Sequence, residues 1–376
     1  IGILLFGTLI FSSCNNETID TVEDTVVLNG NGLTVINYRS SNNGKKSTSN
    51  SNKSTFTGTS IAVFSDELSY RSYNEALEIQ VENWENAFLA QWEYLNEDDL
   101  NAKEEELNFD SERPLTEFEN QIGLQSLRKQ YLLAEETWLN NNVLDVTADP
   151  DNNPIYDFDE SEMAVMNTLA EVQIGTTIIK KLTDKEVNLI NNQITIKNAN
   201  SKNQKTMLIK EDATLMIKES DYDALIDFNN GDYSVINNNN VSITNSTTTT
   251  SCKYAEEVRA EIGGGSDKFC KILIKVPSPS FGWNGKVKSK IVSYKKGFLG
   301  WRKWRTSIAA GARGNVYSAN CDNSPTYINK STGTRKKKKQ VYTWRNKSFG
   351  SHKVENGGMT GLFTYNNVVK ELKLTW

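Results

Sequence analysis

Histidine is almost absent from this sequence of 376 residues, which contains a single one, His352. A zinc site built on a pair of histidines is therefore excluded, and so is the H-E-x-x-H helix of a metalloprotease. The sequence also lacks a G-x-S-x-G nucleophile elbow, and no G-x-G-x-x-G loop follows a predicted strand. An α/β-hydrolase and a dinucleotide-binding domain are therefore not predicted.

Cysteine is scarce as well, with four residues, and the first of them stands in a distinctive place. Residues 1–13 form an apolar run that is too short to span a membrane, which takes about 20 residues. Two small residues, Ser12 and Ser13, then precede Cys14. This pattern predicts a truncated signal peptide followed by a lipobox, in which Cys14 becomes the lipidated first residue of the mature protein.

The other three cysteines are Cys252, Cys270 and Cys321. In an oxidising compartment outside the cytoplasm we expect one disulfide among them, and the sequence leaves its pairing open. One thiol would then remain. A structural zinc site needs four ligands, and the spacings of these cysteines do not supply them.

Acidic residues are scarce at one end of the chain. Residues 252–376 contain 25 Lys and Arg against 7 Asp and Glu, whereas the rest contains 17 against 40. A split of this size predicts two domains whose surfaces carry opposite charge and attract one another. The predicted division is a signal peptide at 1–13, a lipidated tether at 14–27, an acidic domain at 28–245 with a disordered insertion at 39–60, a linker at 246–251 and a basic domain at 252–376.

Two amphipathic helices are predicted in the acidic domain. The first is capped by Ser72, with Glu75 as its capping-box partner, and its apolar residues recur every three or four positions over 77–95. The second covers residues 115–139, where Gly123 introduces a bend. Short alternating runs predict strands around them, at 171–182, 194–196, 207–209 and 215–217. This half is therefore an α/β domain.

The basic domain reads as β structure almost throughout. Its alternating runs lie at 271–276, 286–294, 314–318, 340–345, 361–365 and 372–376, with Gly, Pro, Asn and Ser between them. This pattern predicts an antiparallel domain, and a sandwich is favoured over a barrel. The chain as a whole is therefore predicted to belong to the α+β class.

Several of these segments together carry a family resemblance. They are the lipobox, the helical segment 118–130, the acidic loop 149–157, the segment 169–182, and a β domain rich in Lys, Arg and Trp that ends in LKLTW. The sequence in this respect resembles a family of uncharacterised surface or periplasmic lipoproteins of Bacteroidota. The resemblance implies an envelope location and the architecture described above, and it implies no catalytic residues.

One acidic segment has the oxygen spacing of a calcium loop. Counted from Asp149, positions 1, 3, 5, 9 and 12 are Asp149, Asp151, Asn153, Asp157 and Glu160. Position 6 is Pro154, however, and a tight turn there needs the positive φ of glycine. The alternative is a solvated acidic loop that caps a helix over 159–169. Calcium is the one cofactor that the sequence suggests.

Two stretches of the basic domain interleave cations with aromatic residues. The candidate binding residues are Trp301, Arg302, Trp304, Arg305, Lys336, Lys337, Lys338, Lys339, Trp344 and Arg345. Such a surface could bind an anionic polysaccharide or the phosphates of lipopolysaccharide. Nucleic acid is the least expected ligand, because the predicted location is extracytoplasmic. The alternative is that the acidic domain neutralises these cations.

The function predicted from the sequence is that of a lipid-anchored binding or adhesion protein of the outer membrane. Its basic domain would hold an envelope polyanion by charge attraction, with aromatic stacking on sugar rings. One alternative is a structural component of an envelope assembly, in which the two domains neutralise each other and a further envelope protein is the partner. A hydrolase of extracellular polymers is less favoured, because no carboxylate pair stands out.

Overall fold

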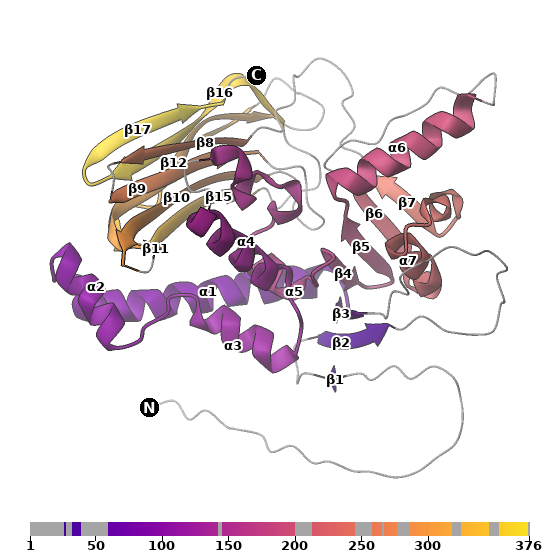
Figure 1. Ribbon diagram of the computed structural model, residues 1–376, viewed down its shortest axis with the longest axis horizontal. Helices are drawn as coiled ribbons and strands as arrows, with labels where there is room; N and C mark the ends of the chain where they lie inside the picture. Colours follow the sequence, from indigo (N-terminus) through magenta and orange to yellow (C-terminus); the bar gives the residue numbers. More distant parts are fainter. Residues whose placement is uncertain are drawn as a thin grey trace, which may run out of the picture.

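The computed structural model describes residues 26–27, 32–38, 59–141, 145–199, 213–244, 258–264, 267–276, 286–298, 300–317, 325–345 and 353–374. They form a mixed α+β structure in which an N-terminal sheet with helices precedes an all-β C-terminal part, as the sequence predicts (Figure 1). The predicted signal peptide and the linker at 246–251 lie outside the described residues. No helix within the described ranges is long and apolar enough to cross a membrane.

The N-terminal part is built on a sheet whose seven strands lie side by side in chain order. They are β1 (Val26–Val27), β2 (Leu33–Tyr38), β3 (Thr59–Phe64), β4 (Glu171–Ile174), β5 (Thr177–Lys181), β6 (Thr214–Lys218) and β7 (Val241–Thr244). Neighbours pair antiparallel, except that β3 and β4 are parallel because a long helical crossover joins them. β1 and β3 begin inside the predicted tether and the predicted insertion.

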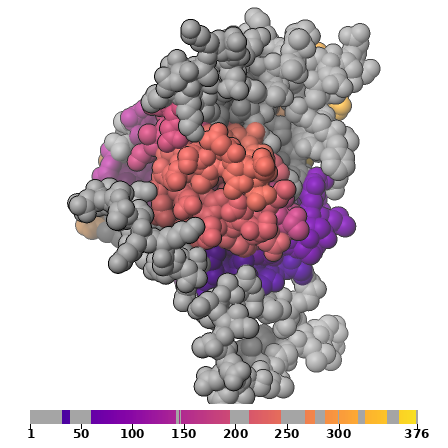
Figure 2. Space-filling model, turned by 90° about the vertical axis from the view of Figure 1, so that its right-hand side faces the viewer, coloured from indigo at the N-terminus to yellow at the C-terminus, as the bar shows by residue number. Residues whose placement is uncertain are grey.

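Five helices make up that crossover, which we call the helical layer. They are α1 (Glu67–Trp92), α2 (Glu97–Glu106), α3 (Arg113–Ile122), α4 (Leu127–Asn141) and α5 (Glu160–Val165). Apolar side chains of α1, α3, α4 and α5 pack on one face of the seven-stranded sheet. Two more helices, α6 (Asp184–Ala199) and α7 (Tyr222–Asn229), cover the other face (Figure 1). Figure 2 views the molecule from the side of β6, β7 and α7.

Local capping explains where the sequence-based helix bounds were wrong. The first helix begins at Glu67 instead of after Ser72, because the Asp66 carboxylate accepts the N–H of Ser69 at 2.7 Å. The second predicted helix is two helices. Gly123 ends α3 in the left-handed conformation (φ +68°), and α4 starts again at Leu127.

Three strand assignments also need correction or confirmation. The predicted strand at 171–182 is a hairpin of β4 and β5, which turns at Gly175 with φ +57°. Residues 194–196 lie in α6, because the three-residue alternation Ile-Thr-Ile is too short to distinguish a strand from a helix turn. The strand at 215–217 is confirmed as β6, and residues 207–209 lie outside the described residues.

The C-terminal part is a sandwich of two antiparallel sheets, which confirms the prediction. One sheet contains β8 (Val258–Gly264), β9 (Lys268–Lys275), β10 (Lys286–Gly297), β11 (Gly300–Lys303) and β15 (Lys339–Arg345). The other contains β12 (Thr306–Tyr317), β13 (Thr326–Ser331), β14 (Arg335–Lys337), β16 (Lys353–Tyr365) and β17 (Val368–Lys373). Their inner faces meet in one apolar core, which includes Ile274, Ile291, Ile308 and Phe363.

Two strands of the sandwich approach each other so closely at one point that only glycine fits. Gly314 on β12 has φ +151° and lies beside a register shift against β16. A Cβ atom at this position would lie 2.9 Å from the Cα atom of Met359 and even closer to the carbonyl oxygen of Gly358. The pairing of β12 with β16 therefore requires glycine here.

We expect Gly314→Ala to lower the free energy of unfolding by about 3 kcal/mol, because the methyl group collides with backbone that cannot move aside. The matched control is Gly333→Ala. Gly333 also has a positive φ, +75°, but no atom lies within 4 Å of the added carbon, so a loss of about 1 kcal/mol is expected. Urea unfolding of both variants measures the difference. Equal losses would contradict the steric explanation.

Candidate functional site

The outer face of the β9–β10 sheet carries lysine at alternate positions. On β10, Val287 and Ile291 point into the sandwich core, so Lys286, Lys288 and Lys290 point away from it toward the helical layer. All three side chains are nevertheless buried, and so are Lys271 and Lys275 on β9. We call this surface the lysine face.

Carboxylates just before and within α5 form ion pairs with the lysine face. The Nζ of Lys286 lies 2.5 Å from Asp159 Oδ2 and 3.0 Å from Glu162 Oε2. The capping box of α5 fixes both acidic side chains. Asp159 is the N-cap residue, and the Glu162 carboxylate accepts a hydrogen bond from the backbone N–H of Asp159 at 2.7 Å. A local helix-capping motif therefore positions the charges that neutralise a distant strand.

The predicted calcium residues form the next part of this charged contact. Asp149 and Asp151 both contact the ammonium of Lys271, at 2.9 and 2.8 Å, and Asp151 also contacts Lys290 at 3.0 Å. Asp157 contacts Lys275 at 2.6 Å. The remaining carboxylate, Glu160, contacts Lys339, and Asn153 caps a short 3-10 turn over Pro154–Tyr156.

These acidic side chains are therefore not arranged as the spacing suggested. No group of three or more Asp, Glu, His or Cys among the described residues could hold a metal ion. The segment is also not the solvated loop of the alternative interpretation, since Asp149, Asp151 and Asp159 are buried. The 3-10 turns instead place these carboxylates against lysine side chains of the basic half, and Asp149 and Asp151 share one of them, Lys271.

The predicted basic residues meet the helical layer along a second line of contacts. Arg305 is fully buried; its Nη1 lies 2.8 Å from Glu85, and its Nε donates to Glu104. Lys337 contacts the same Glu85 at 3.0 Å, and Lys338 contacts Glu104. Lys336 donates to two backbone carbonyl groups at the end of α1, 2.8 Å from Glu93 O and 2.5 Å from Leu95 O.

The remaining members of that predicted set also have partners within the chain. Lys339 contacts Glu112 and Glu160, Arg345 contacts Glu78 and Asp159, and Arg302 contacts Glu105. Trp301 packs edge-on against Phe269, Trp304 donates to Glu97 at 2.9 Å, and Trp344 packs against the sandwich core. The structure thus pairs most of the predicted residues with the helical layer, whereas Trp344 packs on the sandwich core and Arg302 stays about half exposed.

Buried ion pairs of this density shift the pKa values of the acidic partners. Burial raises the pKa of Glu135, but the ammonium groups of Lys303, Lys271 and Lys290 outweigh it and lower this pKa to about 2. The same balance holds the pKa of Asp159 well below its usual range, through Lys286, Lys288 and Arg345. These carboxylates therefore stay ionised in the folded protein at neutral pH.

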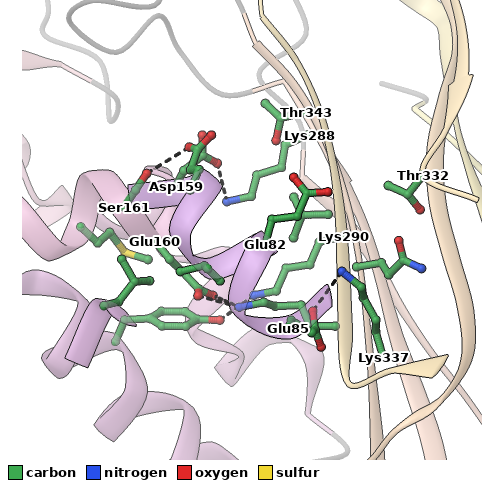
Figure 3. Close-up of a pocket in the computed structure, with 18 of the residues that line it drawn as sticks. Glu82, Glu85, Asp159, Glu160, Ser161, Lys288, Lys290, Thr332, Lys337 and Thr343 are labelled. Atoms are coloured by element: carbon green, nitrogen blue, oxygen red, sulfur yellow. Dashed lines mark hydrogen bonds and ion pairs between the residues drawn. The ribbon is translucent and has the colours of Figure 1, made fainter. Parts of the chain in front are cut away.

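A cavity of about 490 Å³ opens within this interface (Figure 3). Its floor is formed by two cross-strand pairs of β10 and β15, in which Lys288 lies opposite Thr343 and Lys290 lies opposite Val341. Its walls come from α1 and α5, and include Val81, Glu82, Ser161 and Met163. We call it the interface cavity. It combines apolar surface with acidic and basic groups from both halves of the chain.

Lys288 is the most perturbed cation of the cavity floor. Its Nζ lies 3.2 Å from Asp159 Oδ1 and 3.3 Å from the carbonyl oxygen of Phe158. Burial lowers the pKa of Lys288, Asp159 only partly offsets this, and the neighbouring ammonium groups lower it further, to about 8. A buried amine with a shifted pKa that lines a cavity is the usual mark of a functional site.

A second cavity, of about 400 Å³, lies between α2, α4 and β11. Three residues of the predicted basic surface line it, namely Arg302, Trp304 and Lys338. The acidic side chains of Glu104 and Glu135 line it too. It is smaller and presents the same kind of paired charges.

Of the four cysteines, the described residues include Cys270 alone. Cys270 lies buried on β9, with its side chain in the sandwich core. Cys252 and Cys321, its possible partners, lie outside the described residues. Cys14 does so too, so the disulfide and the lipid anchor stay predictions.

Sequence reasoning missed the lysine face itself. The run KVKSKIV does show lysine at every second position, next to an apolar alternation that predicts the strand. Lysine on the outer face of a strand usually signals solvent. The additional signal was the cluster of six acidic residues at 149–162, which needs cations once it is buried.

Comparison with solved structures finds the crystal structure of a DUF4848 family protein from Bacteroides thetaiotaomicron. The match covers 84% of this chain and 97% of that one, at 14% sequence identity and a TM-score of 0.16. A similarity of this size supports no conclusion about the fold or function of this chain. No protein-family model matches the sequence, and no curated protein does.

We expect Lys271→Met to destabilise the protein by about 3–5 kcal/mol, because it leaves the buried carboxylate of Asp149 without its ammonium partner. The matched control is Arg313→Met. This residue pairs with Glu371 at 3.1 Å, but both side chains are about half exposed, so at most about 1 kcal/mol is expected. Urea unfolding compares the two, and a small loss for Lys271→Met would contradict a tightly paired interface.

We also expect the folded protein to lose stability as the pH falls from about 4.5 toward 2. The folded-state pKa values of Glu135, Asp151 and Asp159 are lowered, so the unfolded chain binds more protons in this range. Glu135 alone accounts for about 3 kcal/mol. Thermal melting between pH 7 and pH 2 measures the loss, and a constant melting temperature would contradict it.

Proposed function

We propose that the protein is a lipid-anchored binding protein of the bacterial envelope, and that its ligand occupies the interface cavity. The observation that carries the proposal is the cavity itself. Its volume, about 490 Å³, lies within the range of small-molecule sites, about 300–1,000 Å³. It combines an apolar wall with convergent polar groups, which is the composition that such sites share.

The contacts of the basic residues favour the interface cavity, and not an exposed basic surface, as the ligand-binding site. Arg305, Lys337 and Lys339 already contact buried or half-buried carboxylates of the helical layer. An external polyanion could engage them only after those pairs had been broken, which would leave the carboxylates unpaired at a cost of several kcal/mol each. A ligand that enters the interface cavity meets the same kinds of charges without breaking these pairs.

Anchoring follows from the first cysteine of the sequence. Acylation of Cys14 would hold the chain at the outer membrane, and the acidic stretch behind it would serve as a tether. The membrane, reached through the lipid, is then one partner, and a soluble or polymer-bound envelope ligand is the other.

A second candidate function is that of a structural component of an envelope assembly. The ion-paired interface favours it, because the two oppositely charged halves neutralise each other across it: Arg305 pairs with Glu85 and Glu104, and Lys271 pairs with Asp149 and Asp151. The two candidates differ in one respect that can be measured. A structural component needs no ligand in the interface cavity, so filling the cavity would leave its interactions unchanged.

The test is Val341→Trp, which fills the interface cavity from the floor, measured in the full chain against an array of acidic and neutral envelope oligosaccharides. We expect the wild type to bind at least one member and the variant to bind it at least tenfold more weakly. The matched control is Val368→Trp on β17, where Val368 is 67% exposed and lies outside the cavity lining. The proposal fails if nothing on the array binds, or if the cavity variant binds as the wild type does.

A further inference from the structure

We infer that Lys288 and Thr343 form a site for a single carboxylate group on the floor of the interface cavity, and that the ligand is an acidic sugar. This inference rests on the proposed function, because it names the ligand class of the same cavity. It concerns residues that the predicted basic surface does not include.

The first observation is that the negative charge beside Lys288 is shared. Asp159 contacts three cations, namely Lys286 at 2.5 Å, Lys288 at 3.2 Å and Arg345. Lys286 has a second carboxylate in Glu162, and Arg345 has a second one in Glu78. Among the described residues, no second carboxylate forms an ion pair with Lys288. It is therefore the least neutralised cation of this group.

The neighbouring lysine shows what a fully satisfied ammonium looks like in the same sheet. Lys290 donates to both oxygens of Asp151, at 3.1 and 3.0 Å, and to the hydroxyl of Tyr131 at 2.7 Å. An ammonium has three N–H donors, and these contacts use all of them. Lys288 has one carboxylate oxygen and one backbone carbonyl as acceptors, which leaves it a donor for a ligand.

Thr343 supplies a second donor at the same place. It lies directly opposite Lys288 across β10 and β15, and both residues line the cavity (Figure 3). Side chains in such a pair have Cβ atoms about 5 Å apart, so both belong to the same part of the cavity floor. Among the described residues, the Thr343 hydroxyl has no hydrogen-bond partner.

The charges that act most strongly on Lys288 favour an anion at this point. They are the carboxylate of Asp159 and the ammonium groups of Lys275, Lys286 and Lys290. The other carboxylates nearby pair with neighbouring cations: Asp151 with Lys290, Asp157 with Lys275, Glu162 with Lys286 and Glu78 with Arg345. Burial and the three nearby ammonium groups disfavour the charged form of Lys288. A ligand carboxylate would offset this, because it places a second negative charge beside Lys288.

The rest of the cavity indicates which kind of anion fits. Glu82 and Glu85 on α1 would repel a second negative group, which argues against a densely charged polymer. Carboxylates accept hydrogen bonds from sugar hydroxyl groups. Val81, Met163 and Val341 offer an apolar surface for the face of a sugar ring. One carboxylate, several hydroxyl groups and an apolar ring face together describe a uronic acid residue.

The experiment measures binding of galacturonate, a single uronic acid residue, to the full chain by titration calorimetry, with galactose as the neutral control. We expect galacturonate to bind at least tenfold more tightly than galactose. Lys288→Met should weaken its binding at least tenfold, and Thr343→Val should weaken it severalfold. The matched control is Lys330→Met, an exposed lysine of β13 in the other sheet, which should bind as the wild type does.

Two further readouts separate this site from a merely structural role. The melting temperature of Lys288→Met should be no lower than that of the wild type, because the change removes a poorly neutralised buried charge. The affinity of the wild type should fall as the pH rises above about 8, where Lys288 loses its proton, and Lys288→Met should lose this dependence. Thr343→Val keeps Lys288, so it tests the site even if the methionine variant fails to fold.

The outcomes distinguish the two proposals. If Val341→Trp abolishes binding but Lys288→Met and Thr343→Val do not, the cavity binds a ligand and the carboxylate site is wrong. If all three variants bind as the wild type does, both proposals are wrong. If inorganic phosphate or sulfate competes as strongly as galacturonate, the site takes small anions in general, and the assignment to an acidic sugar is overturned.

Discussion

The structure depends on a layer of buried ion pairs between the lysine face and the helical layer. Removing a charged group from water costs several kcal/mol, and the cost is offset only when a partner of opposite charge lies at hydrogen-bonding distance. Lys271, Lys275 and Lys286 meet this condition, each with a carboxylate within 3 Å. The opposite net charges of the two halves of the chain follow directly, because each half carries the counter-ions of the other. An isolated half would present rows of like charges to solvent.

An apolar interface of the same area would be at least as stable, so the ion pairs must contribute something other than stability. One contribution is register. A shift of β10 by one residue would turn Val287 and Ile291 toward the carboxylates and would place the lysines in the sandwich core. The shifted register would leave the lysines buried in the sandwich core and the carboxylates of the helical layer buried without cations. If the interface were apolar, the same shift would bury no unpaired charge. The capping box at Asp159 has the same effect on the helical side, since it fixes the start of α5 where the lysines need it.

Local patterns were enough to predict the sandwich and the helices α1, α3 and α4, because alternation and helical spacing are properties of neighbouring residues. They did not predict α2, α6 or α7. The interface could not be predicted in the same way. Asp149 and Lys271 are 122 positions apart in the sequence, and no local pattern around either residue indicates that the other will be its partner. The residues from Asp149 to Glu160 have the oxygen spacing of a calcium loop, but in the structure their carboxylates pair with lysines. The helix start was misplaced because Ser72 and Asp66 are both competent caps, and the helix begins after the earlier one, where Asp66 accepts the N–H of Ser69.

The interface cavity and the ion-pair layer are coupled through the charge of Asp159. This carboxylate neutralises Lys286 and Arg345 at the interface and also Lys288 on the cavity floor. A ligand carboxylate bound to Lys288 would free Asp159 to serve the other two cations, and it would bind only when β10 and α5 are in contact. By linkage, any ligand that binds this assembled state stabilises it against separation of the two halves. Ligand binding and the integrity of the interface are then two measures of one equilibrium, so a loosened interface weakens binding without any change in the cavity's own residues.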